Sequence, residues 1–253
     1  MHRFFVPPDW IEGDRVSVEG SLAHQLSRVL RLKPEDRIIV LDDSGWEREV
    51  SLVHFGPDRI IGHVVDKRLT SGEPRTKISL YQSVLKGQRF EFVLQKGTEL
   101  GIVEFVPVIT SRCIISSLDD VSRKAERWQR IILEAAEQAG RGRLPRLRAA
   151  SMFSRACGRA KRFGGLSLIP WEEEKQTNLK EVLNRNGYQG PRRIRPFSIN
   201  LFVGPEGGFS PEEIEIAQSY DVIPVSLGPR VLRAETAGLA ATAAILYELG
   251  DME

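Results

Sequence analysis

The chain has 253 residues, of which 41% are hydrophobic and 28% are charged, and its formal net charge is +2. This composition is that of an ordinary globular protein, and it excludes a collagen-like, low-complexity or strongly charged disordered chain. The length allows one large domain or two smaller ones.

The same composition disfavours a membrane protein, a disulfide framework and a metal site. No apolar run approaches the roughly 18 residues of a membrane helix, and the opening MHRFFVPPDW lacks a signal peptide's apolar core. We therefore expect a cytoplasmic protein with no membrane partner. Cys113 and Cys157 lie far apart in the chain and predict reduced thiols. The four histidines show no metal-ligand spacing, so we expect no metal.

The first part of the chain has the pattern of short strands separated by Asp, Gly and Pro turns. One helix, over 21–32, interrupts four predicted strands, at 15–18, 37–42, 48–55 and 59–65. This arrangement indicates a small module like a β-barrel. The polar stretch KRLTSGEPR (67–75) is typical of a linker.

From Lys77 the pattern changes to strands that alternate with helices, which is typical of a parallel α/β sheet. Strands are predicted at 77–85, 103–110 and 166–171, and helices at 89–100 and 121–139. The long helix carries Trp128, Ile131, Ile132 and Ala135 on one face and ends at Gly140. The polar residues 172–196 predict a mobile loop or a short helix.

The end of the chain predicts strand, loop and helix twice in succession. In LFVGPEGGFSPEE the helix start is well specified, with Ser210 as its cap, Pro211 at the first position and Glu213 placed to close a capping box. The Ala-rich last helix is apolar on most sides, which predicts burial against the sheet or another subunit. We expect loops 204–209 and 228–235 at the carboxyl ends of neighbouring strands, where open α/β sheets bind ligands.

The first of these loops, GPEGGF, has an unusual chemistry. Its glycines admit a ligand to bare main chain, and Glu206 is its one charged side chain. No Gly-Lys-Ser/Thr sequence follows to bind a polyphosphate, and the GxGxxG spacing is absent. An adenosine group with a sulfonium cation nearby suits such a loop. For this loop alone, a tight turn in which Glu206 caps or pairs locally is the simpler interpretation.

The segment 138–171 contains no Asp or Glu but has eight basic residues. Such a run is usually a solvated face, although the exclusion of acids over this length favours a surface that meets phosphates. Nucleic acid is therefore an expected partner.

Taken together, GPEGGFS and LGPRVLRAETA resemble the RsmE-type family, the ribosomal RNA uridine N-3 methyltransferases of the SPOUT superfamily. Further segments are similar to that family in the same order, namely HQLSRVLRLKPED, LQKGTELGI, PVITSRC and EAAEQAGRGRLP. The resemblance spans nearly the whole chain, and the long paired motif makes it specific.

The resemblance implies an α/β SPOUT methyltransferase domain with a carboxyl-terminal trefoil knot (75–253), preceded by a small PUA-like β-barrel domain that binds RNA (1–68). It also implies S-adenosyl-L-methionine as cofactor, a homodimer, and formation of 3-methyluridine in small-subunit ribosomal RNA or in the assembled small ribosomal subunit. Two alternatives stay open. One is a SPOUT methyltransferase acting on another RNA base or a ribose, and the other is a non-catalytic RNA-binding ribosome-assembly factor.

Carried over by position, the cofactor loops lie at 168–171, 203–208 and 227–236. The expected cofactor-binding residues are Leu168, Pro170, Val203, Gly204, Glu206, Gly207, Gly208, Leu227, Gly228, Val231, Leu232 and Thr236.

Uracil's ring imide is protonated at neutral pH, so its methylation needs a base or a cation. Arg233 is the first catalytic candidate and Glu235 the second, with Glu206 as another possible base and Arg230 as another cation. An ion pair that braces the loop would explain Arg233 and Glu235 equally well. The expected RNA-binding residues are Arg28, Arg31, Lys33, Arg112, Arg141 and Arg143.

Overall fold

The computed structural model describes residues 1–115, 117–185 and 196–252. The chain forms two compact units, Met1–Glu73 with Ala136–Leu144, and Pro74–Ala135 with Pro145–Glu253. The sequence places a boundary near the same point, between 68 and 75, but assigns 136–144 to the second domain. The structure places this segment in the smaller unit.

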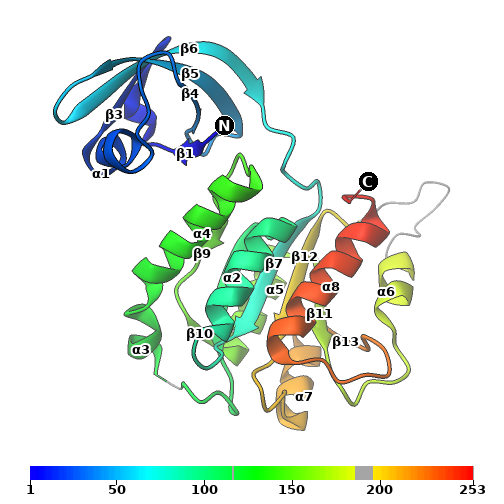
Figure 1. Cartoon of the computed structure of the whole chain (residues 1–253). Helices are drawn as coiled ribbons and strands as arrows, with labels where there is room; N and C mark the ends of the chain where they lie inside the picture. The colour runs from blue at the N-terminus through cyan, green and yellow to red at the C-terminus, as the bar shows by residue number, and fades with distance from the viewer. Residues whose placement is uncertain (116, 186–195, 253) are drawn as a thin grey trace. The chain divides into compact units, whose positions relative to one another are not determined.

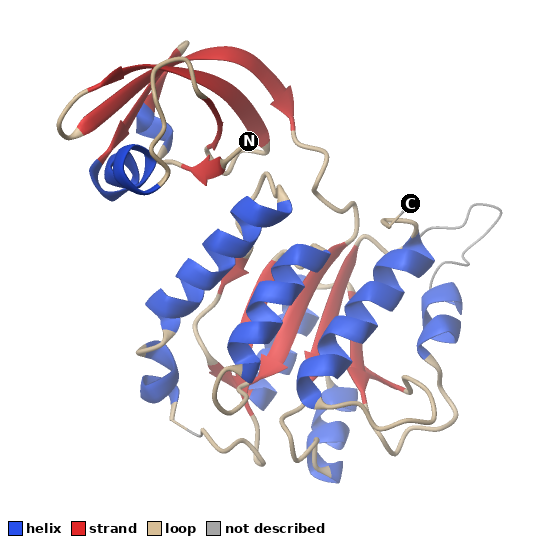
Figure 2. Cartoon of the chain, viewed as in Figure 1, coloured by secondary structure: helices blue, strands red, loops and turns tan. Residues whose placement is uncertain are grey.

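The smaller unit is a six-stranded sheet that curves around a short helical segment (Figures 1 and 2). Its strands are paired in the order β1-β4-β5-β6-β3-β2, and every pair is antiparallel except β1 with β4. The bounds are β1 (Arg3–Phe5), β2 (Ile11–Glu12), β3 (Arg15–Glu19), β4 (Arg37–Leu41), β5 (Trp46–Phe55) and β6 (Arg59–Leu69).

The four strands predicted for this unit are confirmed, and three details of the prediction are wrong. β6 continues to Leu69, so the first residues of the expected linker pair with β5. The expected helix 21–32 is shorter and consists of α1 (Gly20–His24) and a π-helical turn, η2 (Gln25–Val29). The sequence also missed β1, β2 and the turn η1 (Pro8–Trp10), because two or three residues give too little periodicity to detect.

The larger unit confirms the predicted parallel α/β sheet. Its path is β10-β8-β7-β12-β11-β13, with β9 paired to β8, and all of these pairs are parallel. The strands are β7 (Lys77–Ser83), β8 (Glu104–Ile109), β9 (Arg146–Leu147), β10 (Ser151–Met152), β11 (Leu166–Pro170), β12 (Ser198–Val203) and β13 (Ile223–Val225).

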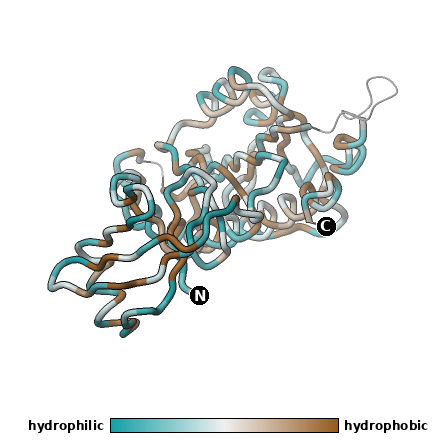
Figure 3. Tube along the Cα trace, turned by 90° about the horizontal axis from the view of Figure 1, so that it is seen from above, coloured by the Kyte–Doolittle hydropathy of each residue, from teal (hydrophilic) through white to brown (hydrophobic). Residues whose placement is uncertain are grey.

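Helices cover both faces of this sheet (Figure 1). They are α2 (Arg89–Leu100), α3 (Leu118–Ser122), α4 (Ala125–Ala139), α5 (Phe153–Phe163), α6 (Leu179–Arg185), α7 (Pro211–Ser219) and α8 (Ala234–Leu249). One core lies between the sheet and α2, α4, α6 and α8, and another between the sheet and α5 and α7. Figure 3 colours the trace by hydropathy, and hydrophobic stretches alternate with hydrophilic ones along both units.

Several helices of this unit agree with the sequence and others differ from it. The capping box of Ser210 and Glu213 at the start of α7 is confirmed. The expected helix 121–139 is divided, because α3 ends at Ser122 and α4 begins at Ala125. α5 was not predicted. Of the expected loop or short helix at 172–196, α6 is a short helix, and residues 186–195 lie outside the described part of the chain.

None of the described helices is long and apolar enough to cross a membrane. Among the same residues, no group of three or more His, Cys, Asp or Glu side chains could hold a metal ion.

One carboxylate organises the segment 136–144 in the smaller unit. Glu73 accepts hydrogen bonds from Arg141 Nε at 2.9 Å and Nη2 at 3.0 Å, and from the main-chain N–H groups of Gly142 and Arg143, each at 3.1 Å. The Arg141 side chain is only 2% exposed. Burial raises the pKa of Glu73, but the hydrogen bonds and charge of Arg141, together with the two N–H groups, lower it more, so it lies below its ordinary value.

We expect Glu73→Gln to lower the free energy of unfolding by about 3 kcal/mol at neutral pH, because the buried ion pair between Arg141 and Glu73 is lost. A carboxylate whose pKa is lowered by folding stabilises the protein above its ordinary pKa, and this contribution is lost as the pH falls through the lowered pKa. Urea unfolding of both proteins between about pH 7 and pH 3 should therefore show a difference that shrinks toward acid. A pH-independent difference would contradict this account of Glu73.

Candidate active site

The candidate active site is a cavity of about 930 Å³ at the carboxyl edge of the larger unit's sheet. It is lined by the loops that follow β11, β12 and β13, together with Arg89 at the start of α2. The sequence placed two of these loops after neighbouring strands, which is wrong: β11 lies between β12 and β13. The loop that follows β11 is therefore the third wall of the cavity.

The glycine loop after β12 is tightly fixed. Gly208 N donates to Pro205 O at 3.0 Å, and Gly208 has φ +68°, a conformation that side chains rarely adopt. A Cβ on Gly204 would lie 3.2 Å from the Phe209 ring and 3.3 Å from the Gly208 main chain, so the ring or the loop would have to shift to admit a side chain. The bare main chain that the sequence indicated is thus part of the cavity wall.

Residues far away in the sequence hold this loop from outside. Arg112 Nη1 donates to Gly207 O at 2.8 Å and Phe209 O at 3.3 Å. Ser111 N donates to Glu213 Oε1 at 2.8 Å, which ties the loop after β8 to the first turn of α7. Arg112 was expected to bind RNA, but the structure uses its guanidinium to hold main-chain carbonyls.

Glu206 is also fixed by long-range contacts. Its Oε1 accepts hydrogen bonds from Lys86 N at 3.1 Å and Arg89 Nη1 at 3.2 Å. Arg89 Nε lies 4.0 Å from Glu235 Oε1. The two carboxylates of the glycine loop and of α8 thus share one guanidinium, and the interpretation of Glu206 as a local cap is wrong.

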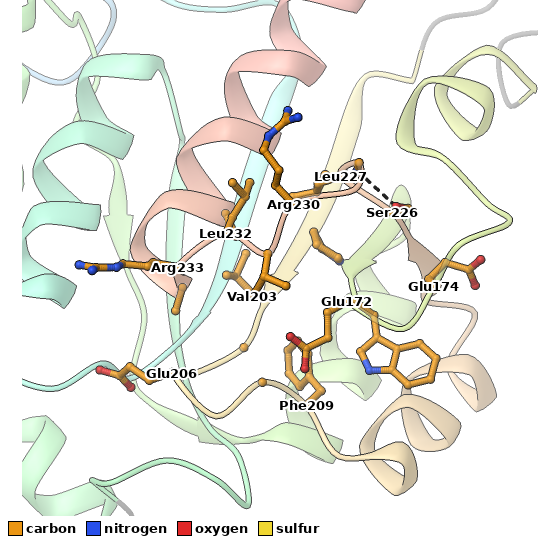
Figure 4. A pocket seen from close by; sticks show the side chains of 18 of the residues that line it. Glu172, Glu174, Val203, Glu206, Phe209, Ser226, Leu227, Arg230, Leu232 and Arg233 are labelled. Carbon is orange, nitrogen blue, oxygen red and sulfur yellow. Dashed lines mark hydrogen bonds between the residues drawn. The ribbon is translucent and has the colours of Figure 1, made fainter.

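The cavity is chemically asymmetric. In Figure 4, Glu206 and Arg233 lie at one end and Glu174 and Ser226 at the other, with Val203 between them. At the second end, Gly228 N donates to Ser226 Oγ at 3.2 Å, and Glu174 Oε1 accepts hydrogen bonds from Gln176 N at 2.7 Å and Thr177 N at 2.8 Å.

Most of the expected cofactor-binding residues line the cavity, and three do not. The lining includes Pro170, Val203, Gly204, Glu206, Gly208, Leu227, Gly228, Val231 and Leu232. Leu168 is fully buried in the core beneath the sheet, because alternate residues of β11 point to opposite faces. Gly207 and Thr236 are outside the lining.

The two expected catalytic residues, Arg233 and Glu235, both line the cavity, as does Arg230. Arg233 is the N-cap residue of α8 and is exposed, whereas the Glu235 side chain is 15% exposed in the first turn. Within the described chain, the contacts of the Arg233 guanidinium include no ion pair.

Sequence reasoning missed several residues of the lining. Glu172, Glu174 and Lys175 follow the predicted strand 166–171. Their position just beyond the end of a strand is the sequence feature that could have identified them as cavity residues. Arg89 gave no local signal, since it is more than a hundred residues before the loops whose carboxylates it contacts.

The acid-free segment 138–171 does not form one basic surface. Arg141 is buried against Glu73. Arg148 and Arg159 both bind Glu104, the second at 2.8 Å. Acids elsewhere in the chain thus neutralise much of the segment, which a count along the sequence could not show. Arg143 is exposed, but its guanidinium donates to main-chain oxygens, including Ser44 O at 2.7 Å.

Known proteins resemble this chain over nearly its full length. The family described as an RNA methyltransferase domain matches residues 72–246. The ribosomal RNA small subunit methyltransferase E of Bacillus subtilis is 31% identical, with 98% of this chain and 97% of that protein covered. The protein of the same name from Synechocystis is 32% identical, with coverage of 96% and 77%.

A solved structure agrees. The ribosomal RNA small subunit methyltransferase E of Neisseria gonorrhoeae, bound to S-adenosyl methionine, superposes with a TM-score of 0.81 at 30% identity, covering 98% of this chain and 97% of its own. The family resemblance of the sequence motifs is therefore confirmed. The chain belongs to the RNA methyltransferase family that includes ribosomal RNA small subunit methyltransferase E.

Proposed function

We propose that the protein transfers a methyl group from S-adenosyl-L-methionine to N3 of a uridine in small-subunit ribosomal RNA. The observation that carries this proposal is the cavity itself, which combines bare main chain with four carboxylates and three arginines at a strand-end edge. Family membership supplies the reaction class.

The residues present fit this cofactor. Adenosine can form hydrogen bonds with main chain, and the loops around Gly204 and Gly228 present main chain without side-chain obstruction. Val203, Leu227 and Leu232 add apolar surface for the ring. The carboxylates of the lining suit a cationic ligand better than a polyphosphate.

When bound, the cofactor supplies a methyl group on a sulfonium: the bond from N3 to carbon forms as the carbon–sulfur bond breaks, leaving a neutral thioether. The chain must align the uracil and accept the imide proton. Glu235 is the better proton acceptor, because Glu206 already accepts two hydrogen bonds whereas, among the described residues, the polar contact of Glu235 is a 4.0 Å ion pair with Arg89. Arg233 lies at the same end of the cavity as Glu206, where its positive charge can stabilise negative charge on the uracil oxygens.

The smaller unit is proposed as a PUA-like, RNA-binding barrel. Its curved six-stranded sheet supports this assignment. Arg28, Arg31 and Lys33 are exposed on the segment that follows α1, where they are available to phosphates. Arg141 is omitted from the proposed RNA contacts because it is buried.

We also propose the trefoil knot and the homodimer of the SPOUT superfamily. Support for the knot comes from the three loops after β11, β12 and β13 that converge on one cavity. Support for the dimer comes from the outward face of α8, where exposed Ala240 and Ala244 precede Tyr247, which is 71% exposed. Exposed small residues beside a tyrosine are suited to a self-complementary contact.

The cofactor assignment predicts that Gly204→Val weakens S-adenosyl-L-methionine binding at least tenfold, or about 1.4 kcal/mol, because the new side chain displaces the loop against Phe209. Calorimetry on the folded variant measures this. The control is Gly158→Ala on α5, whose Cβ would make only an ordinary contact, at 3.5 Å from Tyr220. Equal cofactor affinities of the wild type and Gly204→Val would show that the cofactor does not bind in this cavity.

The reaction assignment is tested with small ribosomal subunits that lack the modification. After incubation with labelled cofactor and digestion of the RNA, nucleoside mass spectrometry should find 3-methyluridine. Methyl groups on a ribose or another base, or no methylation at all, would contradict the proposed function.

In the same assay, Arg233→Ala should reduce kcat about 100-fold with cofactor affinity nearly unchanged. The negative charge on the uracil that Arg233 stabilises develops only as the imide proton leaves. Normal turnover by this variant would reject the role of Arg233 and leave the reaction assignment intact.

A further inference from the structure

Arg89 is a cation of the cavity that neither the motifs nor the family-derived residues include. It lies at the first position of α2, directly after the loop that leaves β7. Because β7 is the neighbour of β12, this position is beside the glycine loop. Its side chain is 49% exposed, so part of the guanidinium faces solvent at the cavity.

The place of Arg89 is unfavourable for helix stability. The amino end of a helix carries partial positive charge and favours acidic side chains. An arginine at this position is therefore repelled by the helix dipole and destabilises the helix. What holds it are two carboxylates from separate elements, Glu206 at 3.2 Å and Glu235 at 4.0 Å. A positive group maintained at this point by two acids of the cavity suggests a role in the chemistry.

The charges of the proposed transfer require such a group. As the imide proton moves from N3 to a carboxylate, negative charge spreads onto the uracil carbonyl oxygens, and the N3 electron pair forms the bond to the methyl carbon. When Glu235 gains this proton it becomes neutral and its attraction for Arg89 weakens, while Glu206 still holds Nη1, so Nε becomes available as the uracil becomes negative. A guanidinium carries five N–H donors, and Glu206 engages Nη1 alone.

We propose that Arg89 is a further catalytic residue, which donates a hydrogen bond to a carbonyl oxygen of the target uracil while Glu206 and Glu235 orient it. This inference rests on the proposed uridine N3 methylation. It assigns the guanidinium a contact with the substrate and leaves cofactor binding to the three loops.

The test compares Arg89→Ala and Arg89→Lys with Arg127→Ala. Arg127 is a matched control, because it pairs with Glu91 of α2 at 2.7 Å but lies outside the cavity lining. Lys86 and Arg112 still hold the glycine loop when Arg89 is replaced, so calorimetry should give a cofactor affinity close to that of the wild type for all three variants, and thermal unfolding should show that they are folded. Single-turnover methylation should fall about 100-fold for Arg89→Ala, less for Arg89→Lys, and remain unchanged for Arg127→Ala.

A second substrate separates catalysis from structure. In RNA containing 5-fluorouridine the imide is more acidic, because fluorine withdraws electrons, so less stabilisation of negative charge is needed. The loss caused by Arg89→Ala should then shrink to about tenfold. An equal loss on both substrates, unchanged turnover, or a loss of cofactor affinity that accounts for the slower rate would overturn the role of Arg89. Absence of 3-methyluridine with the wild-type protein would instead reject the proposed function.

Discussion

The parallel sheet of the larger unit is the constraint on which the candidate site depends. Since β7, β12, β11 and β13 run in the same direction, their carboxyl ends meet at one edge. Each strand must then cross back through a helix or a long connection before the next one begins. Residues that are far apart in the sequence thereby line one cavity, from Arg89 to the turns before α7 and α8.

Long-range contacts give the loops at this edge fixed positions. The glycine loop is held by Arg112 at its carbonyls, by Lys86 and Arg89 at Glu206, and by the Glu213 capping box at its end. A carboxylate and a guanidinium fixed in this way need little reorganisation when charge develops beside them. The same contacts explain why the basic residues of this unit differ in function, since some hold loops and others face the cavity.

The sequence predicted the parts of this structure that depend on local physics. Ser210 and Glu213 form the capping box because its residues are three positions apart, and the alternation of strand and helix identified the sheet. Strand order could not be derived in this way, which is why β11 was not expected between β12 and β13. The side of the sheet that Leu168 faces depends on the same tertiary arrangement.

Charged residues were the hardest to assign from the sequence. Arg141 belongs to a basic, acid-free segment that the sequence predicts to bind phosphates. In the structure it forms an ion pair with Glu73, which lies 68 positions earlier in the chain. No sequence motif identifies Arg89 as a site residue. Its place in the cavity depends on Glu206 and Glu235, two acids that only the fold brings close to it. An ion pair between distant residues has no sequence periodicity, so neither pattern nor local charge could identify it.

The central claim is that one cavity, formed by three strand-end loops, holds the methyl donor. Ultraviolet cross-linking of radiolabelled S-adenosyl-L-methionine, followed by peptide mapping, tests it most directly. The label is expected in peptides containing 203–209 or 226–237, and excess S-adenosylhomocysteine should abolish it. A label confined to the smaller unit, or one that S-adenosylhomocysteine does not displace, would contradict the account.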